Sequence, residues 1–106
     1  MPKGYEVERI TVKDERRLAL PKGARLIALD ERGIDMTTAQ FAKLLHRPSA
    51  FLIGGPDGLS PAIKKTAEKI IRLSALTLPH ALAQVILLEQ LYRAATLLTG
   101  HPYHRE

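Results

Sequence analysis

The chain contains short apolar runs separated by polar breaks and by amphipathic segments. Residues 24–30 and 50–53 are almost continuously apolar, which is typical of strands buried on both faces of a parallel sheet. Residues 73–78 predict a further strand, which ends before Pro79. Residues 5–12 also look like a strand, although the alternation of apolar and polar residues slips at Arg9. The polar segment 31–33 is expected to end the strand over residues 24–30.

Three segments have the spacing of helices. Thr37 or Thr38 can cap a helix that continues to Leu45. Ser60 followed by Pro61 is a typical helix start. The final helix is predicted over residues 80–99. The apolar positions of the second helix follow an i, i+4, i+7, i+8 spacing and are Ile63, Ala67, Ile70 and Ile71.

The alternation of strands and helices predicts an α/β domain with a mostly parallel sheet. Its final helix is apolar over most of its circumference, with only a narrow polar stripe that contains Glu89 and Arg93. Such a helix must be covered on two sides. One side is the sheet, and we expect the other to be a second subunit, which gives a homodimer through this helix. Polar residues interrupt the segment, so we expect no membrane span.

Composition narrows the functional classes. The 106 residues carry a net charge of +5, which favours an anionic partner such as nucleic acid. Cysteine is absent, which excludes disulfides, thiolate catalysis and cysteine-based zinc sites. His101 and His104 are separated by Pro102 and have no carboxylate cluster beside them, so we expect no bound metal. The amino terminus lacks the apolar run of a secretory signal, and we expect a cytoplasmic protein.

The ends of the predicted strands define a candidate pocket. In parallel sheets ligands bind beyond the carboxyl ends of the strands. Those ends are residues 29–31, 54–56 and 76–80, which should converge. The Gly-Gly-Pro-Asp-Gly loop that begins at Gly54 fits no phosphate-binding motif. It is either a tight strand-to-helix turn or a segment whose backbone approaches a ligand closely.

The last six residues, HPYHRE, have the highest density of polar and ionisable side chains in the chain. A carboxyl terminus of this length is ordinarily frayed. Imidazole, phenol and guanidinium groups nevertheless suit base stacking, proton transfer and phosphate contact. Both interpretations remain open from composition alone.

Several separated motifs resemble one known family. FLIGGPDGLSP from Phe51, LSALTLPH from Leu73, LYRA from Leu91, the terminal HPYHRE and ALDERG from Ala28 occur in the same order as in the RlmH family. That family belongs to the SPOUT superfamily and comprises pseudouridine-N3 methyltransferases of 23S ribosomal RNA. The resemblance covers roughly residues 14–106. It implies a deep carboxyl-terminal trefoil knot, S-adenosyl-L-methionine (SAM) as cofactor, a homodimer, and the helix 69 loop of the 70S ribosome as substrate.

The resemblance also implies roles for individual residues. Knot loops would hold SAM with its methyl group directed at the partner subunit's tail. As a hypothesis, His104 or Tyr103 accepts the N3 proton, and His104 is preferred because an imidazole titrates near pH ~6.5 and a phenol near ~10. Arg93, His101 and Arg105 would contact RNA, although Arg93 can equally pair with Glu89. The cofactor-binding residues implied are Leu29, Gly54, Gly55, Leu73, Ser74, Ala75, Leu76, Thr77 and Leu78.

The amino terminus departs from the family pattern. Family members begin with an additional strand and helix, and this chain is substantially shorter there. We expect a single domain over residues 1–106, with an abbreviated part at 1–23 and the SAM-binding knot and tail at 24–106. The alternative to an active enzyme is an impaired or inert knotted dimer that binds SAM or RNA. A shortened natural protein and a deletion variant are both compatible with this pattern.

Overall fold

A central parallel sheet organises the chain in the computed structural model, which describes residues 20, 23–54, 59–74, 76, 78–100 and 103. Its strands are β1 (Arg25–Ile34), β2 (Ser49–Ile53) and β3 (Lys69–Ile71), in the spatial order β2-β1-β3. Both pairs of strands are parallel. This confirms the predicted α/β class with a parallel sheet.

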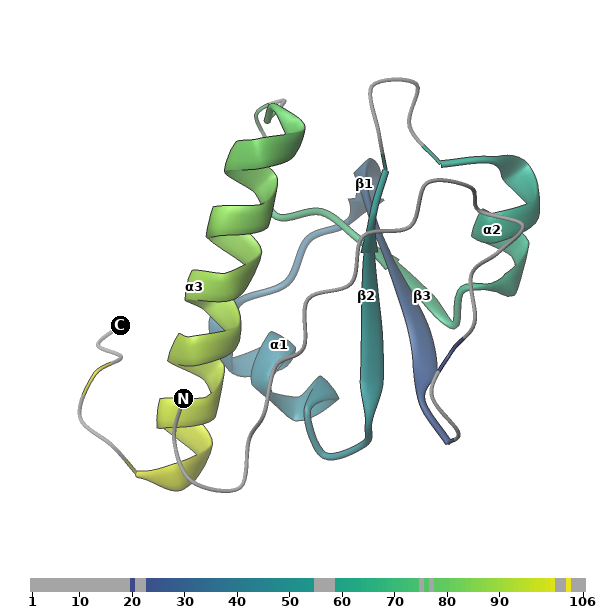
Figure 1. Cartoon of the computed structure of the whole chain (residues 1–106). Helices are drawn as coiled ribbons and strands as arrows, with labels where there is room; N and C mark the ends of the chain where they lie inside the picture. Colours follow the sequence, from purple (N-terminus) through teal and green to yellow (C-terminus); the bar gives the residue numbers. More distant parts are fainter. Residues whose placement is uncertain are drawn as a thin grey trace.

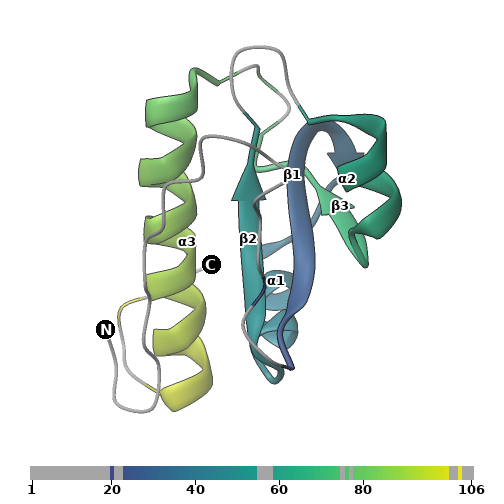
Figure 2. The ribbon, with the colours of Figure 1, turned by 45° about the vertical axis from the view of Figure 1, so that its right-hand side comes forward.

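Helices cover both faces of this sheet (Figure 1). Helices α1 (Thr38–Leu44) and α3 (His80–Thr99) share one face, and α2 (Pro61–Thr66) lies on the other. A view turned by 45° shows α3 and α2 on opposite sides of the strands (Figure 2). The alternation of side chains along β1 produces this layering, because Ile27 and Leu29 pack towards α1 and α3 while Leu26 and Ala28 pack towards α2.

Local sequence signals fix the starts of α1 and α2. The Thr37 hydroxyl accepts a hydrogen bond from the backbone N–H of Gln40, whose side chain accepts one from the backbone N–H of Thr37, forming a capping box. The Ser60 hydroxyl caps α2 by accepting a hydrogen bond from the backbone N–H of Ile63, and Pro61 occupies its first turn. Thr37 is therefore the residue that caps α1, and α3 has the bounds that the sequence predicts.

The expected break at residues 31–33 is wrong, because β1 continues through them to Ile34. Gly33 makes this continuation possible. A Cβ atom on Gly33 would stand 2.5 Å from the carbonyl carbon of Ile71, so only glycine lets the two backbones approach so closely. Ile71 of β3 pairs with both Leu29 and Ile34 of β1, so the register of the two strands shifts between Leu29 and Ile34.

The second helix and the third strand also differ from prediction. Helix α2 ends at Thr66, and Ala67 already has extended backbone angles. Ile70 and Ile71, expected on the helix face, instead lie in β3 and pack on opposite faces of the sheet. The described residues of the segment 73–78 are not in a strand. The strand predicted over residues 5–12 lies outside the described residues.

A buried arginine ties the amino ends of the strands together. Arg25 Nη2 donates to the carbonyl oxygen of Leu44 at 2.6 Å, and Nη1 donates to Glu68 at 2.8 Å. Its Nε donates to the Ser49 hydroxyl at 3.2 Å. Arg47 reaches the same Glu68 carboxylate from the surface. This network lies at the end of the sheet opposite to the candidate pocket.

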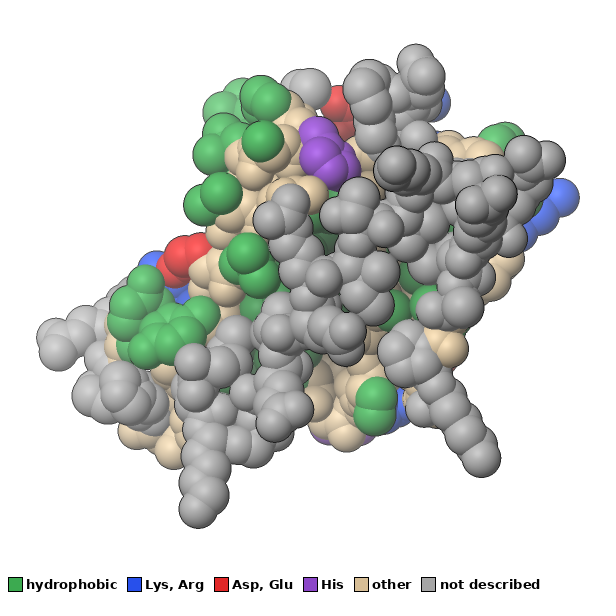
Figure 3. All heavy atoms as spheres, in the orientation of Figure 1, with side chains coloured by type: hydrophobic (Ala, Val, Ile, Leu, Met, Phe, Trp, Pro, Cys, Tyr) green, Lys and Arg blue, Asp and Glu red, His purple; other side chains and the backbone are tan. Residues whose placement is uncertain are grey.

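Helix α3 presents an apolar surface on its outer side. Six of its residues are buried against the rest of the domain, and by length and composition alone the helix could also cross a membrane. Large apolar side chains gather along its outer edge (Figure 3). Those that are exposed are Leu82, Val85, Leu88, Leu97 and Leu98.

Candidate functional site

The segments expected to form the pocket begin at one level of the sheet. Leu29 of β1 is in register with Ile53 of β2 on one side and with Ile71 of β3 on the other. Gly54 directly follows Ile53, and Leu73 follows Ile71 by two residues. Leu73 packs against the same core as Leu29. The convergence predicted from the strand ends is therefore present for these residues.

A histidine side chain connects two of these segments. His80 Nδ1 lies 2.7 Å from the carbonyl oxygen of Gly54. Its Nε2 lies 3.1 Å from the side-chain nitrogen of Gln84 on the next turn of α3. Sequence reasoning did not assign a role to either side chain. The only available signal was the position of His80, directly after a strand-end segment and at the start of a helix.

Among its described residues, the segment between β3 and α3 exposes one large apolar side chain. The Ser74 hydroxyl accepts a hydrogen bond from the backbone N–H of Leu76, which turns the chain locally. Leu76 is 75% exposed, although it is a large apolar residue. Apolar side chains beside free backbone polar groups are the usual lining of a site for an adenine nucleoside. Leu76 has this character, and the binding of SAM by Leu29, Gly54 and this segment stays a prediction.

A shallow hollow of about 240 Å³ lies on the α2 side of the sheet and is distinct from these segments. Its lining includes Asp30, Gly33 and Lys64. The backbone N–H of Arg32 and the ammonium of Lys64, 3.1 Å from the carboxylate, lower the pKa of Asp30. Asp30 is thus held as a carboxylate by a structural pairing with Lys64.

The described residue of the tail, Tyr103, packs back on its own α3. Its ring meets the edge of Tyr92 at a centroid separation of 4.8 Å. The Arg93 guanidinium lies 5.2 Å from the centroid of the same ring. The Tyr103 hydroxyl donates to Glu89 at 3.4 Å. Glu89 also accepts from Arg93 at 2.5 Å and 2.9 Å, and this carboxylate raises the pKa of Arg93.

The two groups of predicted site residues lie at opposite ends of α3 (Figure 1). Gly54, from the predicted SAM-binding segments, contacts His80 at the start of the helix, whereas Arg93 and Tyr103 lie near its end. Thirteen residues separate His80 from Arg93, which corresponds to about 20 Å along a helix axis. The remaining predicted site residues, Gly55, Ala75, Thr77, His101, His104 and Arg105, lie outside the described residues.

The sequence of the chain matches a methyltransferase family. The family model described as predicted SPOUT methyltransferase matches residues 2–104, and the chain belongs to this family. Curated relatives are named ribosomal RNA large subunit methyltransferase H, which confirms the resemblance to the RlmH family. Those of Polynucleobacter necessarius and Polynucleobacter asymbioticus are 61% and 58% identical over 94 residues, or 83% of this chain. That of Albidiferax ferrireducens is 50% identical over 99% of it.

The chain is shorter than these relatives. It spans 70% and 64% of the two Polynucleobacter proteins and 74% of the Albidiferax protein. The similarity nevertheless includes the segments around Leu29, Gly54 and residues 73–78, because the family match extends from residue 2 to residue 104.

Proposed function

We propose that the chain is a SAM-dependent methyltransferase that methylates N3 of a pseudouridine in the helix 69 loop of 23S ribosomal RNA, on the 70S ribosome in the cytoplasm. Membership of the SPOUT family and the printed name of its relatives support ribosomal RNA as the substrate class. The observation that carries the proposal is the convergence of Leu29, Gly54 and the segment after Ile71 at one end of the sheet.

We also propose that the active site is shared between two subunits. The SAM-binding segments and the tail are about 20 Å apart along α3, so one copy does not bring them together. The exposed apolar edge of α3 runs between them, and Val85 in the amino-terminal half of this edge is 61% exposed. Two α3 helices packed antiparallel through this edge would place the tail of each subunit beside the SAM-binding segments of the other. The carboxyl-terminal trefoil knot stays a prediction of the family resemblance.

The proposed chemistry depends on positioning and on one proton. SAM supplies an electrophilic methyl group on a sulfonium, and the attacking N3 must approach in line with the breaking bond. The N3 proton must be removed, and His104 is the proposed base, with Tyr103 as the alternative. His101 and Arg105 are proposed to contact RNA. Arg93 is proposed to act with them, although its pairing with Glu89 and Tyr103 is equally suited to a structural role.

The first experiment is calorimetric titration of SAM into the purified chain, followed by methyl transfer to ribosomes that lack this methylation. Binding with transfer would support the enzyme. Binding without transfer would favour the alternative, an impaired SAM-binding dimer. Loss of transfer in His104→Ala or Tyr103→Phe with unchanged SAM affinity would support the catalytic role of the tail, and full turnover in both variants would refute that role.

Sedimentation of the chain as a monomer at micromolar concentration would contradict the proposed dimer.

A further inference from the structure

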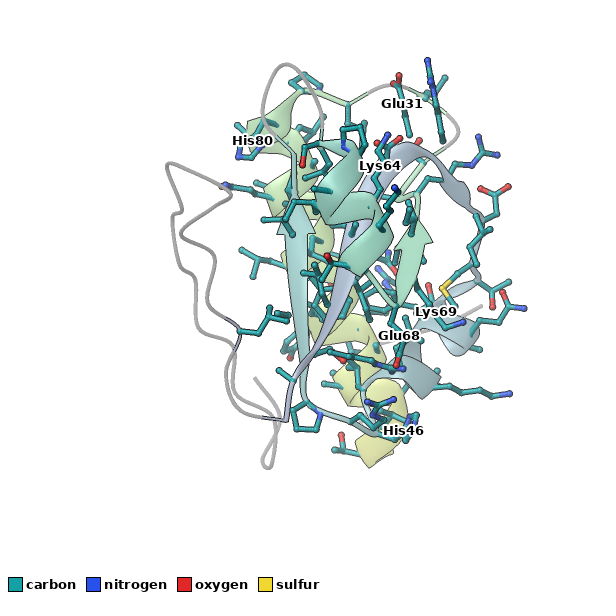
Figure 4. The ribbon with its side chains drawn as sticks, turned by 90° about the vertical axis from the view of Figure 1, so that its right-hand side faces the viewer. Glu31, His46, Lys64, Glu68, Lys69 and His80 are labelled. Atoms are coloured by element: carbon teal, nitrogen blue, oxygen red, sulfur yellow. The ribbon has the colours of Figure 1, made fainter. Side chains whose placement is uncertain are left out.

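The imidazole of His80 joins segments that are 26 residues apart in the chain. It lies where α3 begins, at the end of the sheet where β2 terminates (Figure 4). One ring nitrogen contacts the Gly54 carbonyl and the other contacts Gln84. His80 is exposed, so its orientation is set by these two contacts rather than by burial in the core.

The hydrogen-bond partners indicate which tautomer of the neutral ring fits this geometry. A backbone carbonyl only accepts hydrogen bonds, so Nδ1 must carry a proton to bond to Gly54. The side-chain nitrogen of Gln84 only donates, so Nε2 must be the unprotonated acceptor. The neutral ring with its proton on Nδ1 satisfies both contacts. Gln84 therefore orients His80 so that its N–H points at the Gly54 carbonyl.

This bond restrains the two segments that would hold SAM. Gly54 has no side chain of its own to limit its conformation, and glycine loses the most backbone freedom when it is ordered. Only Pro79 lies between the segment 73–78 and His80. Pro79 caps α3 without a side-chain hydrogen bond. The His80 bond is thus a direct link between the Gly54 carbonyl and the carboxyl end of this segment.

We propose that His80 is a positioning residue for SAM, and that its Nδ1–H fixes the Gly54 carbonyl before the cofactor binds. This inference rests on the proposed function. A pocket whose segments are already ordered does not lose that freedom when it binds, so its affinity is higher. His80 acts through Gly54 and leaves the methyl transfer step itself to other residues.

Two amide substitutions separate the role of Nδ1 from that of Nε2. The side-chain nitrogen of Asn can occupy the place of Nδ1, whereas that of Gln occupies the place of Nε2. In calorimetric titrations of SAM, His80→Ala should raise Kd about tenfold, the usual effect of one lost hydrogen bond. His80→Asn should restore Kd to within about threefold of the unsubstituted chain, and His80→Gln should resemble alanine.

A second histidine supplies a matched control. His46 Nδ1 also contacts a backbone carbonyl, that of Lys43, and Figure 4 shows it at the opposite end of the sheet from His80. His46→Ala removes the same kind of group and should leave SAM affinity unchanged. In transfer assays the KM for SAM should follow the Kd of each His80 variant, with kcat at saturating SAM preserved.

The outcomes separate this role from the proposed function. SAM binding by the unsubstituted chain with equal affinity in His80→Ala would overturn the role of His80 alone. So would equal rescue by Asn and Gln, a comparison that holds even if the alanine variant fails to fold. A fall in kcat without a change in Kd would overturn it as well. No SAM binding by the unsubstituted chain would refute the proposed function and this inference with it.

Discussion

Replacing Arg25 with methionine removes a buried guanidinium while keeping most of the apolar stem in place. The Glu68 carboxylate that loses its partner is 43% exposed, so its charge returns to water without a large penalty. The Leu44 carbonyl, by contrast, accepts a buried 2.6 Å bond from Arg25. An unsatisfied buried carbonyl costs about 1–3 kcal/mol. We therefore expect Arg25→Met to lower the free energy of unfolding by roughly 2 kcal/mol.

Urea unfolding followed by circular dichroism measures this loss. For a chain of this size, 2 kcal/mol corresponds to a fall in melting temperature of about 10 °C. Arg47→Met is the matched control, because Arg47 contacts the same Glu68 carboxylate but is 47% exposed, and its unfolding midpoint should move far less. If both variants unfold at the same midpoint, or if Glu68→Gln costs as much as Arg25→Met, the bond to Leu44 is not the source of the stability.

Three further predictions concern local structure. Gly33→Ala should lower the free energy of unfolding by about 2 kcal/mol or more, because the new Cβ meets the Ile71 backbone; an unchanged thermal melt would show that the strands can separate freely. Lowering of the Asp30 pKa stabilises the fold above about pH 4, and this contribution disappears as pH falls through the lowered pKa. Asp30→Asn should therefore lose less stability on acidification, and identical pH profiles by circular dichroism would contradict this. Thr37→Ala removes a helix cap and should cost about 1 kcal/mol in denaturant unfolding.

Elements defined by local signals could be predicted from sequence. Helix α1 begins after Thr37 because a capping box needs only residues within one turn. Helix α3 has its predicted bounds because Pro79 precedes it and Gly100, with a φ of 77°, ends it in the left-handed region. The apolar runs of β1 and β2 identified their strands for the same reason, since strands covered on both faces need apolar residues at nearly every position.

The errors arise where one pattern fits two structures. Ile70 and Ile71 continue the helical spacing that begins at Ile63 and Ala67, but two adjacent apolar residues also suit a short strand buried on both faces. The length of β1 depends on the close approach of Gly33 to Ile71, a contact between segments far apart in sequence.

Contacts within the candidate site could not be predicted from the sequence either. The motifs located Leu29, Gly54 and the segment 73–78, and the register of the sheet brings them to one level. The bond between His80 and the Gly54 carbonyl joins residues 26 positions apart, and no spacing rule predicts which carbonyl a histidine will contact.

The stacking of Tyr103 on α3 sets a limit on the reach of the tail. His104 directly follows Tyr103 in the chain, and consecutive Cα atoms lie about 3.8 Å apart. While the ring stays against Tyr92 and Arg93, the imidazole of His104 can meet a nucleotide only in a small volume around that point. If Tyr103 itself takes the proton, its hydroxyl must first lose the proton that it donates to Glu89, and substrate engagement then includes the cost of breaking this hydrogen bond.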